Sequence, residues 1–103
     1  MRLKGYQILA RNWRTRYGEI DLVVKRGSTL VFVEVKARWS KKKGSPEEAL
    51  TKDKKKRLLR LAEIYLRQNP HSGPVRLDVV AIDFSREKPQ IRHYEGAIYA
   101  EET

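Results

Sequence analysis

Two segments rich in β-branched residues, joined by a short turn, constrain the fold of this chain more than any other feature. They are residues 19–25 (EIDLVVK) and 29–37 (TLVFVEVKA). The intervening Lys25–Ser28 suits a tight turn in which Gly27 can adopt a positive φ, so the pattern predicts an antiparallel hairpin. Residues 29–37 are apolar on both faces at their start, which is typical of a central strand covered on both sides.

The rest of the chain predicts three more strands and one long helix. In all, strands are expected over residues 6–13, 19–25, 29–37, 75–84 and 90–94, the last at an edge of the sheet. Apolar residues 58, 61, 62 and 65 recur at helical spacing and predict a helix from about Thr51 to Gln68. Residues 45–48 (SPEE) suit the start of a shorter helix. The order β-β-β-α-β-β predicts one α/β domain over residues 1–103, with the long helix packed on one face of a mixed central sheet.

The charge of the chain indicates what it binds. Lys and Arg number 23 against 13 acidic residues, which gives a net charge of +10. Basic surfaces bind phosphate backbones, although a solubility device or a thermophile's charged surface is the alternative. The excess of cations favours nucleic acid. The chain has no cysteine, so disulfides and thiolate zinc sites are excluded. No run of apolar residues suits a membrane span or a signal peptide, so we expect a cytoplasmic protein without a membrane partner.

Glu34 and Lys36 interrupt a strand whose other residues indicate core. Charged groups are seldom buried without a compensating partner. A hairpin turn centred on 26–27 places Glu34 opposite Glu19, with Asp21 as its diagonal neighbour, and a register two residues longer places Asp21 directly opposite Glu34. In both registers Asp21 and Glu34 share a face.

Two carboxylates that share a face on neighbouring strands suit a hard divalent cation. Mg²⁺ and Mn²⁺ prefer oxygen ligands, and Mg²⁺ is commonly held by one or two carboxylates together with waters and phosphates. Lys36 would lie beside them and orient an attacking water or stabilise charge on a phosphoryl group, which is phosphodiesterase chemistry. The alternative is a surface salt bridge between Lys36 and Glu34, with Asp21 incidental. Glu19 is either a third metal ligand or an ion-pair partner of Arg14 or Arg16.

Basic residues concentrate just after this strand. Between residues 36 and 60 there are eleven Lys or Arg against three acids. The candidate nucleic-acid contacts are Arg38, Trp39, Lys41, Lys42, Lys43, Lys52, Lys54, Lys55 and Lys56. A solvated helix face is the alternative, above all for Arg57 and Arg60. Three aromatic residues lie among arginines and either stack on unpaired bases or pack at sheet edges: Trp13, Tyr17 and Trp39.

Asp78 interrupts an apolar strand in the same way as Glu34. It is expected to pair with a nearby Arg or Lys rather than to bind metal. His71 in a loop and His93 on the edge strand are too far apart in the predicted order to form a zinc site.

The stretch RNWRTRYGEIDLVVKRGSTLVFVEVKAR, followed by GSPEEAL and a basic helix, resembles the bacterial YraN-like family. The likeness extends from Gly5 to about Tyr99, and the GEID and FVEVKAR motifs carry most of it. These proteins are predicted endonucleases of the PD-(D/E)xK superfamily, with a restriction-endonuclease-like fold related to archaeal Holliday junction resolvases. The resemblance implies that Asp21 is the metal-binding Asp and that Glu34 and Lys36 form the E-x-K pair.

The resemblance has further implications. Superfamily members often place a basic or amide residue of the long helix beside the metal, and Lys54 matches that role. Similar proteins usually begin with a helix that carries a glutamate near the metal. This chain starts at what resembles the end of that helix, so either a later start codon was chosen or the helix is absent, which would remove a ligand and favour a homodimer. The expected function is a Mg²⁺- or Mn²⁺-dependent endonuclease acting on branched or single-stranded DNA. The alternatives are a nucleic-acid-binding module without efficient cleavage and a basic protein–protein adaptor.

Overall fold

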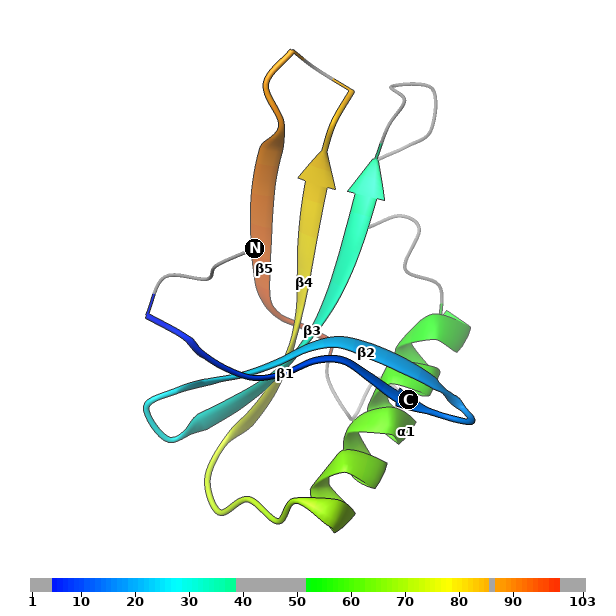
Figure 1. Ribbon diagram of the computed structural model, residues 1–103, viewed down its shortest axis with the longest axis vertical. Helices are drawn as coiled ribbons and strands as arrows, with labels where there is room; N and C mark the ends of the chain where they lie inside the picture. The colour runs from blue at the N-terminus through cyan, green and yellow to red at the C-terminus, as the bar shows by residue number, and fades with distance from the viewer. Residues whose placement is uncertain (1–4, 39–51, 86, 99–103) are drawn as a thin grey trace.

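In the part of the chain that the structure describes, five strands form one mixed sheet in the order β1-β2-β3-β4-β5, with a single long helix on one face (Figure 1). The computed structural model describes residues 5–38, 52–85 and 87–98. The elements are β1 (Gln7–Thr15), β2 (Gly18–Arg26), β3 (Thr29–Arg38), α1 (Lys52–Gln68), β4 (Val75–Asp83) and β5 (Gln90–Ile98). Only β3 and β4 pair in parallel, through the α1 crossover. The predicted mixed sheet and long helix are confirmed, β5 extends four residues beyond its predicted end, and the predicted short helix at 45–48 lies outside the described residues.

The helix packs its apolar stripe on one face of the sheet. Leu58, Leu61, Ala62 and Tyr65 are its buried residues, as their spacing predicted. Phe32 on β3 is fully buried against them, and its ring meets Tyr65 edge-on at 5.4 Å between centroids. Burying such a large side chain contributes roughly 1.5–3 kcal/mol. This α1-side core comprises Ile20, Val23, Leu30, Phe32, Leu58, Leu61, Ala62, Tyr65, Leu77 and Val79.

The opposite face of the sheet carries a second core. It is formed by Leu22, Val24, Val31, Val33 and Val80. Successive residues of β3 alternate between the two cores, so β3 is the central, covered strand that its sequence predicted. Among the described residues no helix is long and apolar enough to cross a membrane.

The β2–β3 hairpin turns through Gly27 and Ser28. Arg26 pairs with Thr29 and Leu22 pairs with Val33, which is the longer of the two registers that the sequence left open. Gly27 has a φ of +58°, a conformation that costs other residues energy. Continued by one more pair, this register sets Asp21 opposite Glu34.

The alternation of β2 is broken at Asp21. Ile20 lies in the α1-side core, whereas Leu22, two residues further on, lies in the second core. On β1 the residue opposite Asp21 is Asn12, whose φ of +49° is uncommon outside glycine. The two strands therefore change the face that they present at the same position, and Asp21 occupies that position on β2.

Candidate metal and phosphate site

Asp21 lies where β2 and β3 separate. The pairing between them ends at Leu22 and Val33, while β3 continues beside β4 to Arg38. Figure 1 shows β3 turning away from β2 beyond this point. The N–H of Val35 has lost its strand partner and donates instead to Asp21 Oδ2, at 2.7 Å. The backbone of β3 thereby fixes one oxygen of the Asp21 carboxylate.

Glu34 and Lys36 extend from the adjacent part of β3. Lys36 Nζ lies 3.0 Å from Glu34 Oε1, and the two side chains are 22% and 20% exposed. The salt bridge between Lys36 and Glu34, which the sequence offered as the alternative to a metal site, is therefore present, although it is largely buried. Among the described residues, Asp21 Oδ1 and Glu34 Oε2 have no hydrogen-bond partner. We call Asp21, Glu34 and Lys36 the carboxylate–lysine cluster.

The electrostatics of this cluster are unfavourable for an extra negative charge. Burial raises the pKa of Asp21 above its ordinary value, and the charges of Glu34 and Glu19 raise it further. The Val35 N–H and the Lys36 ammonium oppose these effects without outweighing them. The cluster is thus a pocket of negative charge in a chain of net charge +10.

Glu19 forms the ion pair that was one of its two predicted alternatives. Arg14 Nε lies 3.0 Å from Glu19 Oε2. Within residues 5–38, 52–85 and 87–98, no three His, Cys, Asp or Glu side chains form a group that could hold a metal ion. Any metal here would rely on the two carboxylates of the cluster, with water or phosphate completing its coordination.

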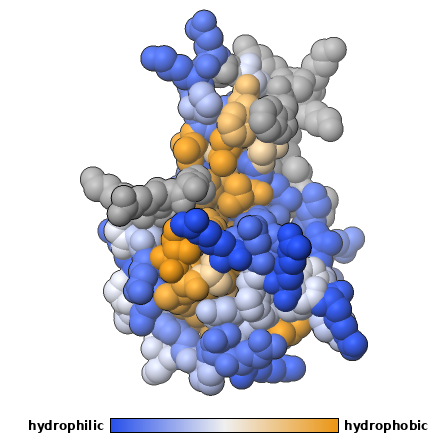
Figure 2. Space-filling model, viewed as in Figure 1, coloured by the Kyte–Doolittle hydropathy of each residue, from blue (hydrophilic) through white to orange (hydrophobic). Residues whose placement is uncertain are grey.

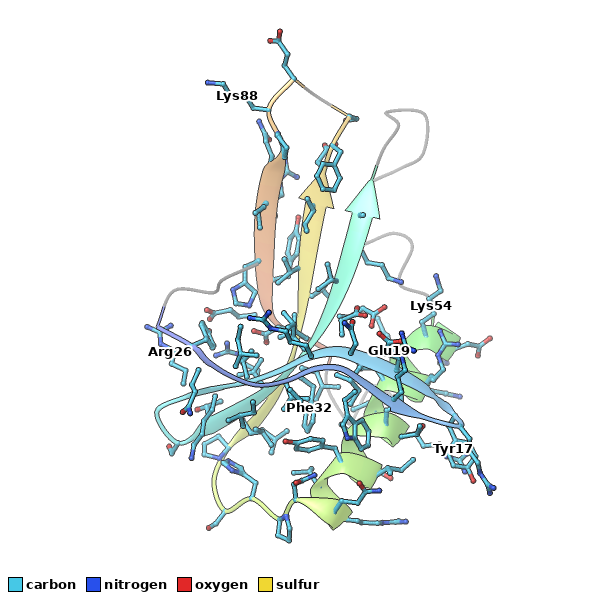
Figure 3. All side chains as sticks on the ribbon, viewed as in Figure 1. Tyr17, Glu19, Arg26, Phe32, Lys54 and Lys88 are labelled. Atoms are coloured by element: carbon cyan, nitrogen blue, oxygen red, sulfur yellow. The ribbon has the colours of Figure 1, made fainter. Side chains whose placement is uncertain are left out.

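The basic residues of α1 differ in exposure. Lys54 and Lys55 are half-buried, as expected from extending the apolar stripes back one turn, whereas Lys52 and Lys56 are exposed. Figure 3 shows Lys54 at the N-terminal end of α1 and Glu19 on β2. The predicted contacts at residues 39 and 41–43 lie outside the described residues, and so does the side chain of Arg38.

A second polar network, on the opposite side of the sheet, surrounds the fully buried Asp78. Arg76 binds its carboxylate through Nε and a terminal nitrogen, at 2.8 and 2.9 Å, which confirms the predicted pairing. His93 Nε2 lies 2.6 Å from Asp78 Oδ2, and Tyr6 accepts a hydrogen bond from Arg76 at 2.6 Å. Burial acts to raise the pKa of Asp78, but the hydrogen bonds from Arg76, the Gly96 N–H and His93 lower it overall.

Sequence reasoning missed the parts that Tyr6 and His93 play in this network. Arg76 and Asp78 are two residues apart on one strand, which is a local signal of pairing. Tyr6 immediately precedes β1 and His93 lies in β5, and no local sequence pattern joins either segment to Asp78. The network connects three parts of the sheet and leaves none of its buried side-chain atoms without a partner.

Comparison with known proteins identifies the family. The model of the uncharacterised protein family UPF0102 matches residues 1–82. The chain belongs to this family. UPF0102 is the YraN-like family, so the resemblance drawn from the GEID and FVEVKAR motifs is confirmed.

Several UPF0102 proteins are similar to this chain over most of their length. The protein of Syntrophomonas wolfei is 48% identical over 98 residues, which is 94% of this chain and 85% of that protein. The protein of Mycolicibacterium vanbaalenii is 44% identical over 94 residues, covering 89% and 78%. That of Symbiobacterium thermophilum is 51% identical over 80 residues, covering 77% and 68%. Each is named as a UPF0102 protein.

Proposed function

We propose that this UPF0102 protein is a metal-dependent endonuclease that hydrolyses phosphodiester bonds in DNA, built on a restriction-endonuclease-like fold. The observation that carries the proposal is the carboxylate–lysine cluster. Two carboxylates and an ammonium group from separating strands meet in a partly buried site within a strongly basic chain. The YraN-like resemblance supports the same assignment of Asp21, Glu34 and Lys36.

The donor set suits Mg²⁺ or Mn²⁺. Asp21 Oδ1 and Glu34 Oε2 are hard oxygen donors without protein partners in the described chain, and these ions favour such donors. The raised pKa of Asp21 reflects burial and repulsion between carboxylates, and a divalent cation would relieve the repulsion. When bound, the metal would supply Lewis-acid polarisation of the phosphate and a more acidic water.

The side chains of the chain itself have distinct roles in this proposal. Asp21 is oriented by the Val35 N–H, so its second oxygen has a fixed direction. Glu34 holds Lys36 and would also bind the metal, while the remaining N–H groups of Lys36 can donate to an attacking water or to a phosphate oxygen. Lys54, half-buried at the first turn of α1, supplies further positive charge toward the phosphate.

Cleavage assays with Mn²⁺ on linear, forked and four-way-junction DNA test this proposal. We expect Glu34→Gln and Lys36→Met to reduce the rate by at least about a hundredfold, because each removes a group that acts on the reacting phosphate. Matched controls are Glu87→Gln and Lys88→Met in the exposed β4–β5 turn, which change the same charges away from the cluster. Cleavage that persists in the cluster variants would overturn the proposal.

A second candidate is a nucleic-acid-binding module that does not cleave efficiently. Two observations favour it: Lys36 is engaged by Glu34, and the described residues contain no group of three metal-binding side chains. Salt-dependent DNA binding without cleavage, equal in wild type and Glu34→Gln, would select this candidate.

A further inference from the structure

A basic pocket lies beside the tip of the β1–β2 hairpin. Its volume is about 620 Å³. Its lining includes Tyr17 from the hairpin and Lys56, Arg60, Glu63, Ile64 and Arg67 from α1, and we call it the Tyr17 groove. Figure 2 shows hydrophilic residues gathered at the lower right, where Figure 1 places this hairpin tip and α1.

Tyr17 presents an aromatic surface that the core does not use. Tyr17 is 47% exposed, whereas the rings of Phe32 and Tyr65 are buried in the core. The guanidinium carbons of Arg16 and Arg60 each lie 5.1 Å from the centre of its ring. Such exposed rings among cations form the stacking platforms of proteins that bind single-stranded nucleic acid.

The charge around Tyr17 is left without internal compensation. Lys56, Arg57 and Arg67 make no ion pair within the described parts of the chain. Glu63 is the acidic residue in the lining, against three cations. A ligand for this groove is therefore expected to be anionic as well as able to stack.

The hairpin tip is fixed in place against the helix. Thr15 Oγ1 accepts a hydrogen bond from the Tyr17 N–H at 2.9 Å, which tightens the turn. Gly18 comes so close to α1 that a Cβ at this residue would lie 3.3 Å from Leu61 Cδ1. Tyr17 is therefore held over α1 before any ligand arrives, and little ordering entropy would be lost on binding.

We propose that the Tyr17 groove binds a single-stranded segment of nucleic acid, with an unpaired base stacked on Tyr17 and phosphates against Lys56, Arg60 and Arg67. This deepens the endonuclease proposal and rests on it. Tyr17 precedes Asp21 by four residues, about 13 Å along an extended strand, so base and scissile phosphate are a few nucleotides apart. The substrate class is DNA or RNA with an unpaired flank beside the cleaved bond.

Fluorescence anisotropy in EDTA tests the groove without requiring cleavage. The probes are labelled oligothymidylate, oligouridylate of the same length and a fully paired duplex. We expect Tyr17→Ala to weaken single-strand binding by roughly fivefold to a hundredfold, and to change duplex binding much less. Tyr17→Phe, which keeps the ring, should restore single-strand affinity. Arg60→Gln should reduce, by about one, the slope of the logarithm of the binding constant against the logarithm of the salt concentration.

The control variant is Lys88→Gln, which removes one exposed charge in the β4–β5 turn, far from Tyr17 in Figure 3. Because Tyr17 is exposed, its replacement should leave the thermal unfolding curve unchanged, and circular dichroism checks this. The groove proposal would be overturned if wild type did not bind the single-stranded probes. It would also be overturned if Tyr17→Ala weakened duplex and single-strand binding equally, or if it weakened binding of polyglutamate as much as binding of oligothymidylate. Tyr17-dependent binding with no cleavage of any substrate would support the groove and reject the endonuclease proposal.

Discussion

At the scale of single residues, Asp21 is the position where stability and the proposed function conflict. Folding raises its pKa above the ordinary value of 3.8, chiefly through burial. The protonated form therefore favours the folded state. Its contribution is fully present below the unfolded pKa and is lost as pH rises through the folded pKa. At neutral pH the ionised Asp21 consequently destabilises the metal-free protein.

We expect Asp21→Asn to raise the melting temperature at pH 7 in EDTA. Asparagine keeps an oxygen that can accept from the Val35 N–H, while it removes the charge that burial and Glu34 disfavour. The advantage should disappear below about pH 4, where aspartate is protonated in both states. Thermal melts over this pH range measure the effect. A lower melting temperature for the variant at pH 7 would contradict the account.

Asp78 behaves in the opposite way. Its pKa is lowered by folding, so its contribution is present above the unfolded pKa and is lost as pH falls through the folded pKa, in the acid range below about pH 4. We expect Asp78→Asn to cost about 3–5 kcal/mol of unfolding free energy at pH 7, because Arg76 loses its buried partner. Urea titration measures this loss.

The matched comparison is Arg14→Gln, which breaks an ion pair whose arginine is 76% exposed. Exposed pairs contribute at most about 1 kcal/mol, so this variant should unfold close to wild type. Equal losses for the two variants would show that the Asp78 network is no stronger than a surface contact.

At the scale of elements, patterns within one segment predicted most of the fold. The period of β3, the turn at Gly27 and the helical spacing of Leu58 and Leu61 each have a local physical cause. The antiparallel pairing of β2 and β3 likewise followed from the turn residues between them. These features required no knowledge of distant parts of the chain.

Features that depend on two segments at once were not predictable in this way. The sequence left two hairpin registers open, and the packing of both cores selects one of them. The break in alternation at Asn12 and Asp21 arises because both strands change face together. The Tyr17 groove was equally hidden: Tyr17 was a candidate stacking residue, but its position over α1 depends on the length of the hairpin.

Substitutions at two glycines can distinguish the effect of docking the β1–β2 hairpin on α1 from the effect of backbone strain alone. Gly18 has a φ of +143° and lies against Leu61, whereas Gly27 has a φ of +58° and nothing within 4 Å of its would-be Cβ. Each alanine substitution should cost about 1–3 kcal/mol of stability. We expect only Gly18→Ala to weaken single-strand binding as well, because it displaces the hairpin tip from α1.

Anisotropy with oligothymidylate, at a temperature where both variants are folded, makes the comparison. Similar affinities for Gly18→Ala and Gly27→Ala would mean that the contact between hairpin and helix does not position Tyr17.

At the scale of the whole molecule, the distribution of charge sets two opposing demands. A net charge of +10 attracts phosphate backbones at long range. The carboxylate–lysine cluster has an excess of negative charge at the place where the scissile phosphate would lie. Without a divalent cation the protein should attract DNA to its surface and repel it from the cluster.

This opposition makes a prediction about binding that is separate from cleavage. In EDTA we expect Glu34→Gln to bind DNA severalfold more tightly than wild type, because one carboxylate no longer repels the phosphate. Addition of Ca²⁺, an oxygen-seeking ion that often fails to support hydrolysis, should tighten wild-type binding and leave the variant nearly unchanged. Glu87→Gln, an equal change of charge on the exposed β4–β5 turn, should keep the full response to Ca²⁺. If Glu34→Gln and Glu87→Gln respond alike, the effect comes from net charge alone and the cluster does not hold the metal at the phosphate.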